Sequence, residues 1–175
     1  WQYIGSNTRV PRDVLGDIEA QVASVQLGAR RFHELFQTYG KKTLTSACSE
    51  LMDYSEGMLR RRINEIPDGE YIAEGFLDDD GVNREKKLPL KVTITIKGDS
   101  AKVDTTGSSQ QVPTAYNVPF EGSTKVTCYF AFRALLLDTY TNTEYIPQNE
   151  GSFRPIEVFS PEGSIFNPTF PAPCQ

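Results

Sequence analysis

The stretch LKVTITIKGDSAKVDT, residues 90–105, decides the fold of the β-rich part of the chain. Val92, Ile94 and Ile96 alternate with polar residues, which is the period of a strand with one buried face and one solvated face. Gly98 and Asp99 have the composition of a hairpin turn, so residues 101–105 are expected to return as the partner strand. The stretch therefore predicts a hairpin within an antiparallel meander.

The segment before this hairpin predicts one more strand. The helical period ends at the Pro-Asp-Gly turn of residues 67–69, and residues 71–77 have the pattern of a strand. The acidic run that follows, residues 78–81, lacks the alternating carboxylates and the distal glutamate of an EF-hand calcium loop. A solvated turn between two strands is therefore the favoured interpretation of this run.

The N-terminal third of the chain carries a helical period instead. In residues 11–39 apolar side chains recur at alternating spacings of three and four, the a/d seam of a long helix. The seam consists of Leu15, Ile18, Val22, Val25, Ala29, Phe32, Phe36 and Tyr39. Gly40 is placed to end this helix in a left-handed cap. A second helix is expected over residues 46–63, joined through residues 41–45 into an antiparallel helical hairpin.

A third helix is expected over residues 124–138. Apolar residues lie nearly all round it, which is typical of a buried central helix. Prolines then break the chain into short extended pieces, among which residues 156–159 form the one credible strand. The predicted fold class is α+β: a helical hairpin, residues 1–66, followed by a β-rich α+β region, residues 67–175, with an antiparallel meander and one buried helix.

Composition excludes several classes of protein. The net charge of −5 gives no electrostatic footprint for nucleic acid. No apolar stretch approaches the roughly 20 residues that cross a bilayer, and no signal-peptide pattern is present. The sequence opens on Trp1 and ends in a Pro-rich segment, so we expect a fragment of a larger cytoplasmic subunit without a complete active site.

The residue types that most often carry chemistry are sparse. Cys48, Cys128 and Cys174 are widely spaced and form no C-x-x-C pair, so three reduced thiols are favoured over a zinc or redox motif. His33 is the single histidine, which leaves a thiol nucleophile without a credible base and a metal without its usual ligands. No metal site is expected within this chain.

The order of short motifs is more informative than any one of them. They are NTRVP at 7–11, GDIEAQ at 16–21, YG at 39–40, SE at 55–56, Arg60, IPDGEY at 66–71, DDDG at 78–81, VDTTGSSQ at 103–110, Asn117, IPQNEG at 146–151, RPI at 154–156, PEGS at 161–164, NP at 167–168 and PA at 171–172. With these motifs in this order the chain resembles the hydantoinase B family, which includes the C-terminal half of 5-oxoprolinase and a subunit of acetone-type carboxylases. Thr105 departs from the family pattern, which has an aromatic residue before this Thr-Gly-Ser turn.

The resemblance implies an activity for the parent protein. It is ATP-dependent hydrolysis of cyclic amides such as hydantoins and 5-oxoproline, carried out with a hydantoinase A-type subunit that uses ATP, in a hetero-oligomer. A divalent metal ion is implied for the parent complex, held by His- and Asp-containing motifs N-terminal to this region. No cofactor is expected in the fragment, which alone is expected to be inactive, and no catalytic residue is assigned.

Seven residues at family-motif positions are the candidates for a site. They are Asp104, Gly107, Asn117, Asn149, Arg154, Glu162 and Asn167. The resemblance implies that their loops line the substrate cleft or contact the ATP-using subunit, whereas in the structural interpretation Gly and Asn set turns. An arginine can bind a carboxylate bidentately, so for Asn149 and Arg154 the two interpretations carry equal weight.

Two alternatives to the hydrolase stay open. The parent could be an ATP-dependent ketone carboxylase, because the residues that define the substrate lie elsewhere. The chain could also be mainly an assembly module, with the seam of residues 11–39 binding a partner subunit and the loops doing no chemistry.

Overall fold

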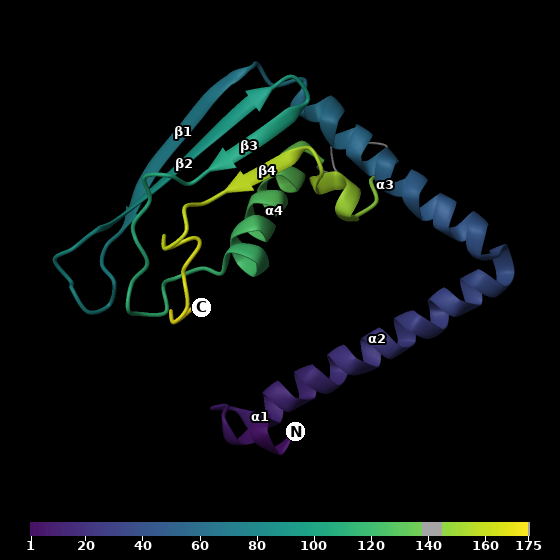
Figure 1. The fold of residues 1–175 in the computed structure, drawn as a ribbon, viewed down its shortest axis with the longest axis horizontal. Coiled ribbons are helices and arrows are strands. Elements are labelled where there is room, and N and C mark those ends of the chain that lie inside the picture. The colour runs from purple at the N-terminus through teal and green to yellow at the C-terminus, as the bar shows by residue number, and fades with distance from the viewer. Residues whose placement is uncertain (138–144, 175) are drawn as a thin grey trace. The chain divides into compact units, whose positions relative to one another are not determined.

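The computed structural model describes residues 1–137 and 145–174, which fall into two compact units, Trp1–Glu50 and Leu51–Gln175 (Figure 1). The elements are α1 (Gln2–Ser6), α2 (Pro11–Tyr39), α3 (Lys41–Ile63), β1 (Gly69–Leu77), β2 (Leu88–Lys97), β3 (Ser100–Asp104), η1 (Phe120–Thr124), α4 (Lys125–Leu136), η2 (Glu150–Phe153) and β4 (Ile156–Phe159). None of the helices in this described part is long and apolar enough to cross a membrane.

Helix α2 has the bounds that its apolar period predicts. Pro11 stands in its first turn, where a missing amide costs nothing, and Gly40 ends it. The Gly40 amide donates to the Phe36 carbonyl at 2.9 Å. Its φ of 78° is positive as predicted, but its ψ of 153° is extended, so the cap differs from a left-handed helical one.

Helix α3 begins earlier than predicted. It starts at Lys41, directly after Gly40, so the connection expected over residues 41–45 is helical. The Thr45 hydroxyl donates to the Lys41 carbonyl at 3.0 Å, so this side chain bonds to the preceding turn of the same helix. Gly40 alone supplies the break, and the prediction that the two helices pack as a hairpin stays a prediction.

The second unit contains a four-stranded sheet in the order β1-β2-β3-β4. Strands β1, β2 and β3 are antiparallel neighbours, with Tyr71 opposite Ile94 and Ile94 opposite Val103. The turn between β2 and β3 lies at Gly98, whose φ is 58°. The predicted meander is therefore confirmed, including the hairpin formed by β2 and β3.

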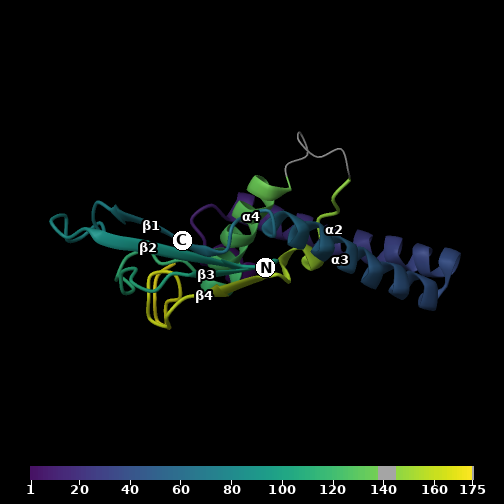
Figure 2. The same cartoon turned by 90° about the horizontal axis from the view of Figure 1, so that it is seen from above.

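Strand β4 adds to this meander in a direction that the sequence did not indicate. It runs parallel to β3, with Ala101 opposite Ile156 and Asp104 opposite Phe159. Parallel neighbours leave the sheet at the same edge. The chain segments that follow β3 and β4 consequently come together below the sheet in Figure 1, and Figure 2 shows the same grouping.

The core of this unit lies on one face of the sheet. Its buried apolar residues come from α3, the inner face of the strands, α4 and the segment before β4: Met58, Leu59, Ile63, Ile96, Ala101, Val103, Phe132, Leu137, Ile146 and Ile156. A smaller cluster of Leu88, Val112 and Ile165 holds the loops to the start of β2.

Helix α4 is less buried than predicted. It covers Lys125–Leu136, and of its side chains only Phe132 is fully buried in the described part of the chain. Phe130 and Leu135 are 68% and 80% exposed. The helix is apolar all round, but only one of its faces packs on the sheet, which corrects the prediction of a fully buried helix. The predicted final residue, Asp138, lies outside the described residues.

The acidic turn after β1 is also more structured than predicted. Asp80 is buried, and its carboxylate accepts hydrogen bonds from the amides of Val82 and Asn83 at 2.9 and 2.6 Å. Those backbone hydrogen bonds, the Asn83 bond first, lower the pKa of Asp80. The interpretation as a solvated turn was wrong for this residue, because one of three consecutive carboxylates turns inward to organise the loop.

Candidate functional site

The seven candidate residues fall in two places within the second unit. Asp104, Gly107, Asn117, Glu162 and Asn167 belong to the loop layer, by which we mean residues 104–118 and 160–174. Asn149 and Arg154 lie instead beside η2, before β4, where they contact α3. The parallel pairing of β3 and β4 explains the first grouping, because it brings both loops to one edge of the sheet.

A line of three buried hydroxyls joins the two halves of the loop layer. Thr105 Oγ1 donates to Ser160 Oγ at 2.7 Å, and Ser160 Oγ lies 3.0 Å from Ser164 Oγ. The Thr105 amide also donates to the Phe159 carbonyl, so Thr105 is bonded both to the last residue of β4 and to the residue that follows it. Thr105, which departs from the family pattern, therefore has a polar partner that a phenylalanine in its place could not use.

Asn117 is the most completely satisfied polar side chain of the loop layer. It is 0% exposed. Its Nδ2 donates to the carbonyls of Val112, Thr114 and Pro173 at 2.7, 3.1 and 2.8 Å. Its Oδ1 accepts from the Val112 amide at 2.8 Å. One amide group thus holds the C-terminal segment against the loop after β3.

Asp104 and Gly107 shape the turn that follows β3. Asp104 Oδ1 accepts from the Thr106 amide at 2.8 Å. Partial burial acts to raise the pKa of Asp104, but hydrogen bonds from Thr106 and the charge of Lys102 outweigh it, so this pKa is lowered. Gly107 has a φ of 99°, and a Cβ there would lie 2.9 Å from Lys91 Cδ. Both residues therefore have structural roles in the turn.

The other two members differ from each other in exposure. Asn167 Nδ2 donates to the Ser160 carbonyl at 3.0 Å, and its own carbonyl accepts from the Gly163 amide at 2.8 Å. Glu162 is exposed, and within the described residues its carboxylate has no hydrogen bond or ion pair. Glu162 is consequently the carboxylate of the loop layer that is most available to another molecule.

A shallow polar hollow of about 450 Å³ lies on the outer face of the sheet beside Asp104. Its lining combines carboxylates, lysines and hydroxyls: Glu70, Ile72, Lys91, Thr93, Thr95, Lys102, Asp104 and Thr106. Lys91 is paired with Glu74 at 3.1 Å and Lys102 with Glu157 at 3.5 Å. Asp104 is thus the candidate residue that faces a polar depression.

The second grouping, which we call the α3 clamp, consists of Asp53, Ser55, Glu56 and Arg60 of α3 with Asn149 and Arg154. Asn149 Nδ2 donates to Ser55 Oγ at 2.8 Å, while its Oδ1 accepts from the Gly151 amide and caps η2. The motif residues of 55–56 and of 149–154 are therefore brought together from distant parts of the chain.

Ion pairs complete the α3 clamp. Arg154 Nη1 lies 2.8 Å from Asp53 Oδ1 and 3.0 Å from Glu56 Oε2. Arg60 Nη2 lies 2.8 Å from Glu56 Oε1, and Arg60 Nη1 lies 3.1 Å from Asp99 Oδ1. Glu56 sits between two guanidinium groups, and their hydrogen bonds, from Arg154 first and Arg60 second, lower its pKa.

Replacing Glu56 by glutamine is expected to reduce the free energy of unfolding at neutral pH by about 1–2 kcal/mol. The folded-state pKa of Glu56 lies below its ordinary value of 4.5. Its stabilisation is therefore present above that value and is lost as the pH falls through the lower, folded-state pKa. Urea denaturation of both proteins should show a difference that shrinks in acid, because glutamine does not titrate.

Glu65→Gln is the matched control for this prediction. Glu65 pairs with Arg62 at 3.1 Å, but it is well exposed. Its loss is expected to change the free energy of unfolding by less than about 0.5 kcal/mol. A gap between wild type and Glu56→Gln that stays constant from neutral to acid pH would contradict the ion-pair explanation.

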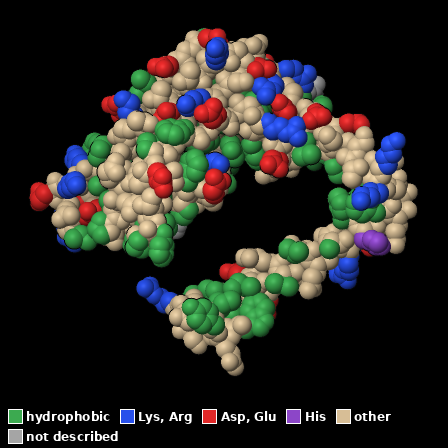
Figure 3. All heavy atoms as spheres, viewed as in Figure 1, with side chains coloured by type: hydrophobic (Ala, Val, Ile, Leu, Met, Phe, Trp, Pro, Cys, Tyr) green, Lys and Arg blue, Asp and Glu red, His purple; other side chains and the backbone are tan. Residues whose placement is uncertain are grey.

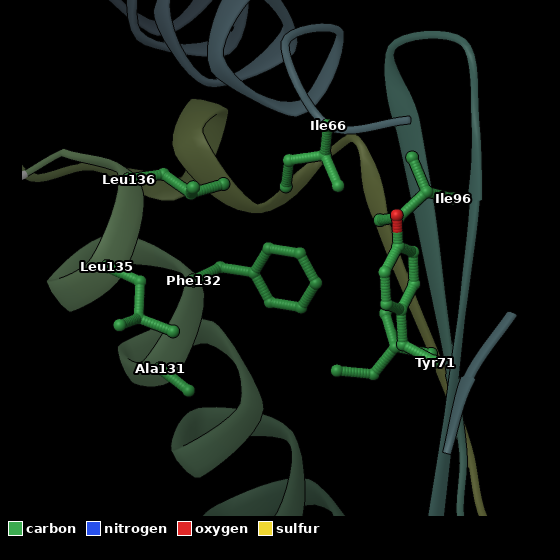
Figure 4. A pocket seen from close by; sticks show the side chains of 8 residues that line it. Ile66, Tyr71, Ile96, Ala131, Phe132, Leu135 and Leu136 are labelled. Carbon is green, nitrogen blue, oxygen red and sulfur yellow. The ribbon is translucent and has the colours of Figure 1, made fainter. Parts of the chain in front are cut away.

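An apolar pocket of about 280 Å³ lies between α4 and the inner face of the sheet (Figure 4). Its lining is almost wholly hydrocarbon: Ile66, Tyr71, Ile94, Ile96, Ala131, Phe132, Leu135 and Leu136. Phe132 points from α4 toward Tyr71 and Ile96 across the pocket. The Tyr71 hydroxyl is bonded to the Pro67 carbonyl at 2.8 Å, so the pocket offers no polar group to orient an amide.

The described residues do not form a metal centre. No group of three or more His, Cys, Asp or Glu side chains within residues 1–137 and 145–174 is arranged to hold a metal ion. Cys48, Cys128 and Cys174 are free thiols, and burial raises the pKa of Cys128. His33 is exposed on α2, where its ring lies 3.1 Å from Gln37 Nε2.

Several residues that organise these two places were not among the seven candidates. Ser160 links Thr105 to Ser164, and Ser55 links α3 to Asn149. Gly151 packs on the Met52 backbone. Ser55 and Gly151 stand in the quoted motifs, which was the available signal, whereas nothing in the sequence marks Ser160.

Comparison with known proteins agrees with the order of the motifs. The family model of hydantoinase B/oxoprolinase matches residues 1–175. The B-type subunit of a D-/L-hydantoinase, so named in Pseudomonas sp. (strain NS671), is 42% identical over 99% of this chain and 30% of its own length. The beta subunit of the caprolactamase of Pseudomonas jessenii is 30% identical over 90% of this chain and 26% of its own length.

A solved structure extends this likeness to three dimensions. The crystal structure of the ATP-dependent caprolactamase from Pseudomonas jessenii has a TM-score of 0.77 and 27% identity, covering 96% of this chain and 27% of that chain. The chain belongs to the hydantoinase B/oxoprolinase family. It spans less than a third of the length of the relatives that it matches here.

Proposed function

We propose that this chain is part of the B-type subunit of an ATP-dependent cyclic amide hydrolase that opens hydantoins or 5-oxoproline. The observation that carries the proposal is the match of the whole chain to a family whose members are named as hydantoinase and caprolactamase subunits. Because these relatives are named as single subunits of larger enzymes, they support work in a complex. We propose an A-type ATP-using subunit in the cytoplasm as the partner.

The chemistry explains why ATP is needed. An unstrained amide is a poor electrophile, and transfer of a phosphoryl group to its oxygen converts that oxygen into a leaving group. One water adds to the activated carbon and the ring C–N bond breaks, which leaves an acyl phosphate, and a second water then releases the phosphate. ATP, amide and two waters thus give ADP, phosphate and the ring-opened product. The described residues do not fit the divalent metal implied for such complexes, so we place that metal in another part of the parent subunit and derive no step from it.

Within that complex we propose that this chain supplies a fixed edge for the substrate cleft. Its loop layer is pinned by Asn117 and by the hydroxyl line, whereas Glu162 and Asp104 face outward. Residues held by a rigid scaffold position a substrate more accurately than mobile ones do. The α3 clamp then keeps this scaffold attached to α3.

The test is an assay of the parent subunit together with its ATP-using partner. ATP hydrolysis and ring opening are measured with hydantoins and 5-oxoproline, and carboxylation is measured with ketones and bicarbonate. We expect ring opening that depends on ATP, and no turnover by the 175-residue chain alone. Carboxylation of ketones without ring opening, or ring opening that does not consume ATP, would show that the proposal is incorrect.

A further inference from the structure

Strand β1 forms an outer edge of the four-stranded sheet, because in the described part of the chain it pairs with β2 alone (Figure 1). It is nine residues long and contains neither proline nor lysine. Its register runs from Gly69 opposite Ile96 to Leu77 opposite Leu88 without a bulge. The other edge strand, β4, has only four residues. Natural proteins keep free edge strands short or interrupt them with proline, lysine or a bulge, so a long regular edge is typical of a strand with a further neighbour.

The backbone of β2 shows which residues of β1 face this open edge. The Lys91 amide donates to Ser108 Oγ, and the Lys91 carbonyl accepts from the same hydroxyl, at 2.9 Å in both cases. Ser108 follows β3, so Lys91 directs its backbone groups to the β3 side. Because this direction alternates along a strand, the neighbours of Lys91 bond to β1, where Ala73 and Gly75 are opposite them. The residues of β1 whose amides and carbonyls point away from the sheet are therefore Glu70, Ile72, Glu74 and Phe76.

These outward backbone groups call for a strand and not for a helix. In the described part of the chain no further backbone hydrogen bond involves the amides or carbonyls of the four residues. The first unit cannot supply a strand from its described elements, which are α1, α2 and the start of α3, because helices use their amides and carbonyls internally. An added strand bonds to an edge at every second residue along its length.

The apolar pocket borders the same strand on the inner face of the sheet (Figure 4). Tyr71 of β1 lies on one side of it, and Phe132 and Leu135 of α4 lie on the other. A strand paired with β1 would direct every second side chain toward this inner face. An apolar side chain beside Tyr71 would then enter the pocket, whose volume is about 280 Å³ and whose lining is almost wholly hydrocarbon. The pocket therefore favours a strand with apolar residues on its inner face.

The outer face of β1 argues against a second copy of the same strand. Glu70 and Glu74 lie on this face, where Glu74 is 3.1 Å from Lys91. Two antiparallel β1 strands paired around a two-fold axis would place four glutamates on one face of the joined sheet, and like charges on neighbouring strands repel. Acidic and basic side chains are interspersed on the visible face of the second unit (Figure 3). Backbone pairing and the pocket, more than a field of one sign, therefore select the neighbour of β1.

We propose that a β-strand from the part of the parent subunit outside these 175 residues pairs with the outer edge of β1 and inserts an apolar side chain into the pocket beside Tyr71. The chain spans less than a third of the length of its hydantoinase and caprolactamase relatives, so most of such a subunit is available to supply the strand. This inference rests on the proposed function only in assigning the chain to a longer B-type subunit, and it requires no catalytic step.

The first test is amide hydrogen exchange in the intact parent subunit without ATP or substrate, resolved to single residues by mass spectrometry. We expect the outward amides of Ile72 and Glu74 to exchange at least about 100-fold more slowly than free peptide amides. The inward amides of Tyr71 and Ala73, which bond to β2, are the internal control and should be protected in either case. Fast exchange at Ile72 and Glu74 beside slow exchange at the two controls would overturn the proposal.

The second test identifies the neighbour of β1. Ile72 is replaced by the photoreactive p-benzoylphenylalanine in the purified parent subunit, and the crosslinked peptides are mapped after irradiation. We expect a crosslink to a segment of the same polypeptide that lies outside the 175 residues. Crosslinks confined to the 175 residues, as when the first unit covers the edge, or crosslinks that join two copies, would contradict the proposed strand.

The third test uses proline, which an open edge tolerates and a paired one does not. We expect Ile72→Pro to reduce the protection of the Glu74 amide in the parent subunit by at least about tenfold, because the added strand loses a donor and meets the proline ring. Ile72→Thr, which keeps the amide, is the matched control and should reduce it by less than about threefold. Equal protection in both variants would count against pairing at this edge.

These tests fail separately from the proposed function. A parent subunit with a protected β1 that opens no ring would contradict the proposed function alone. A subunit that opens hydantoins with its partner but leaves the outward amides of β1 unprotected would contradict this inference alone.

Discussion

Replacing Gly151 by alanine is expected to separate residues 149–153 from α3 and to lower the free energy of unfolding of the second unit by about 3 kcal/mol. A Cβ at Gly151 would overlap the backbone carbonyl of Met52 in the middle of α3. Met52 cannot yield, because its carbonyl belongs to the helical backbone. Urea denaturation followed by circular dichroism measures the effect.

The cause of this effect is steric and not conformational. Gly151 has no positive φ in the structure, so alanine could adopt its backbone angles. The methyl group would nevertheless push η2 away from α3, which would lengthen the Asn149 to Ser55 hydrogen bond and disturb the Arg154 ion pairs. The packing of Phe153 on Tyr129, with ring centroids 4.5 Å apart, would shift with it.

Gly57→Ala provides the matched control. Gly57 lies in α3 and is exposed, and a Cβ there would meet nothing within 4 Å. The same chemical change should stabilise the protein by about 0.5–1 kcal/mol, because alanine is the better helix former. If both variants had the same free energy of unfolding, the close approach of η2 to α3 would be disproved.

The elements that the sequence predicts correctly are those with a local period. The alternation of Val92, Ile94 and Ile96 predicts β2, and the a/d spacing of residues 11–39 predicts α2 to the residue. Gly40 and Gly98 correctly predict the end of α2 and the turn after β2. These signals are also local, since a positive φ depends on the single residue that adopts it. The start of α3 was missed because no local signal distinguishes residues 41–45 as helix or as turn.

What the sequence does not predict depends on contacts between distant segments. The parallel pairing of β4 with β3 is set by packing across more than fifty residues, and no period records it. The inward turn of Asp80 depends on which of three consecutive carboxylates meets the amide of Asn83. The partial exposure of α4 is similar, because an apolar surface predicts burial without saying which face of the helix packs.

In the candidate site, too, the sequence identifies single residues but not their contacts with distant segments. The motifs identify Asn149 and Arg154, but only the structure shows that their partners are Ser55, Asp53 and Glu56. That placement gives both residues a structural explanation, and their proposed role at a substrate cleft stays a prediction. Asn117 shows this most clearly: its motif position predicts a site residue, and the structure shows a buried amide with four hydrogen bonds. Changing one atom of that amide should therefore have a large effect on stability.

Replacing Asn117 by aspartate should therefore be the most damaging isosteric change in the loop layer, lowering the free energy of unfolding at neutral pH by about 3–5 kcal/mol. The new carboxylate would turn an oxygen toward the carbonyls of Val112, Thr114 and Pro173, where the amide now donates. It would lie in a position that is 0% exposed, and the groups bonded to Asn117 in the described part of the chain are all backbone amides and carbonyls, which cannot compensate its charge.

The pH dependence of this variant separates electrostatic from steric damage. Burial and the facing carbonyls should raise the pKa of the introduced carboxyl above the value of about 3.9 found in unfolded chains. The loss of free energy of unfolding is then complete above the raised, folded-state pKa. It becomes smaller as the pH falls toward the unfolded-state pKa, because the protonated acid can donate a hydrogen bond. Asn64→Asp, at an exposed position, should change stability by less than about 0.5 kcal/mol at either pH. Since aspartate and asparagine have the same shape, a penalty for Asn117→Asp that does not fade in acid would mean that the four hydrogen bonds are not what holds this segment.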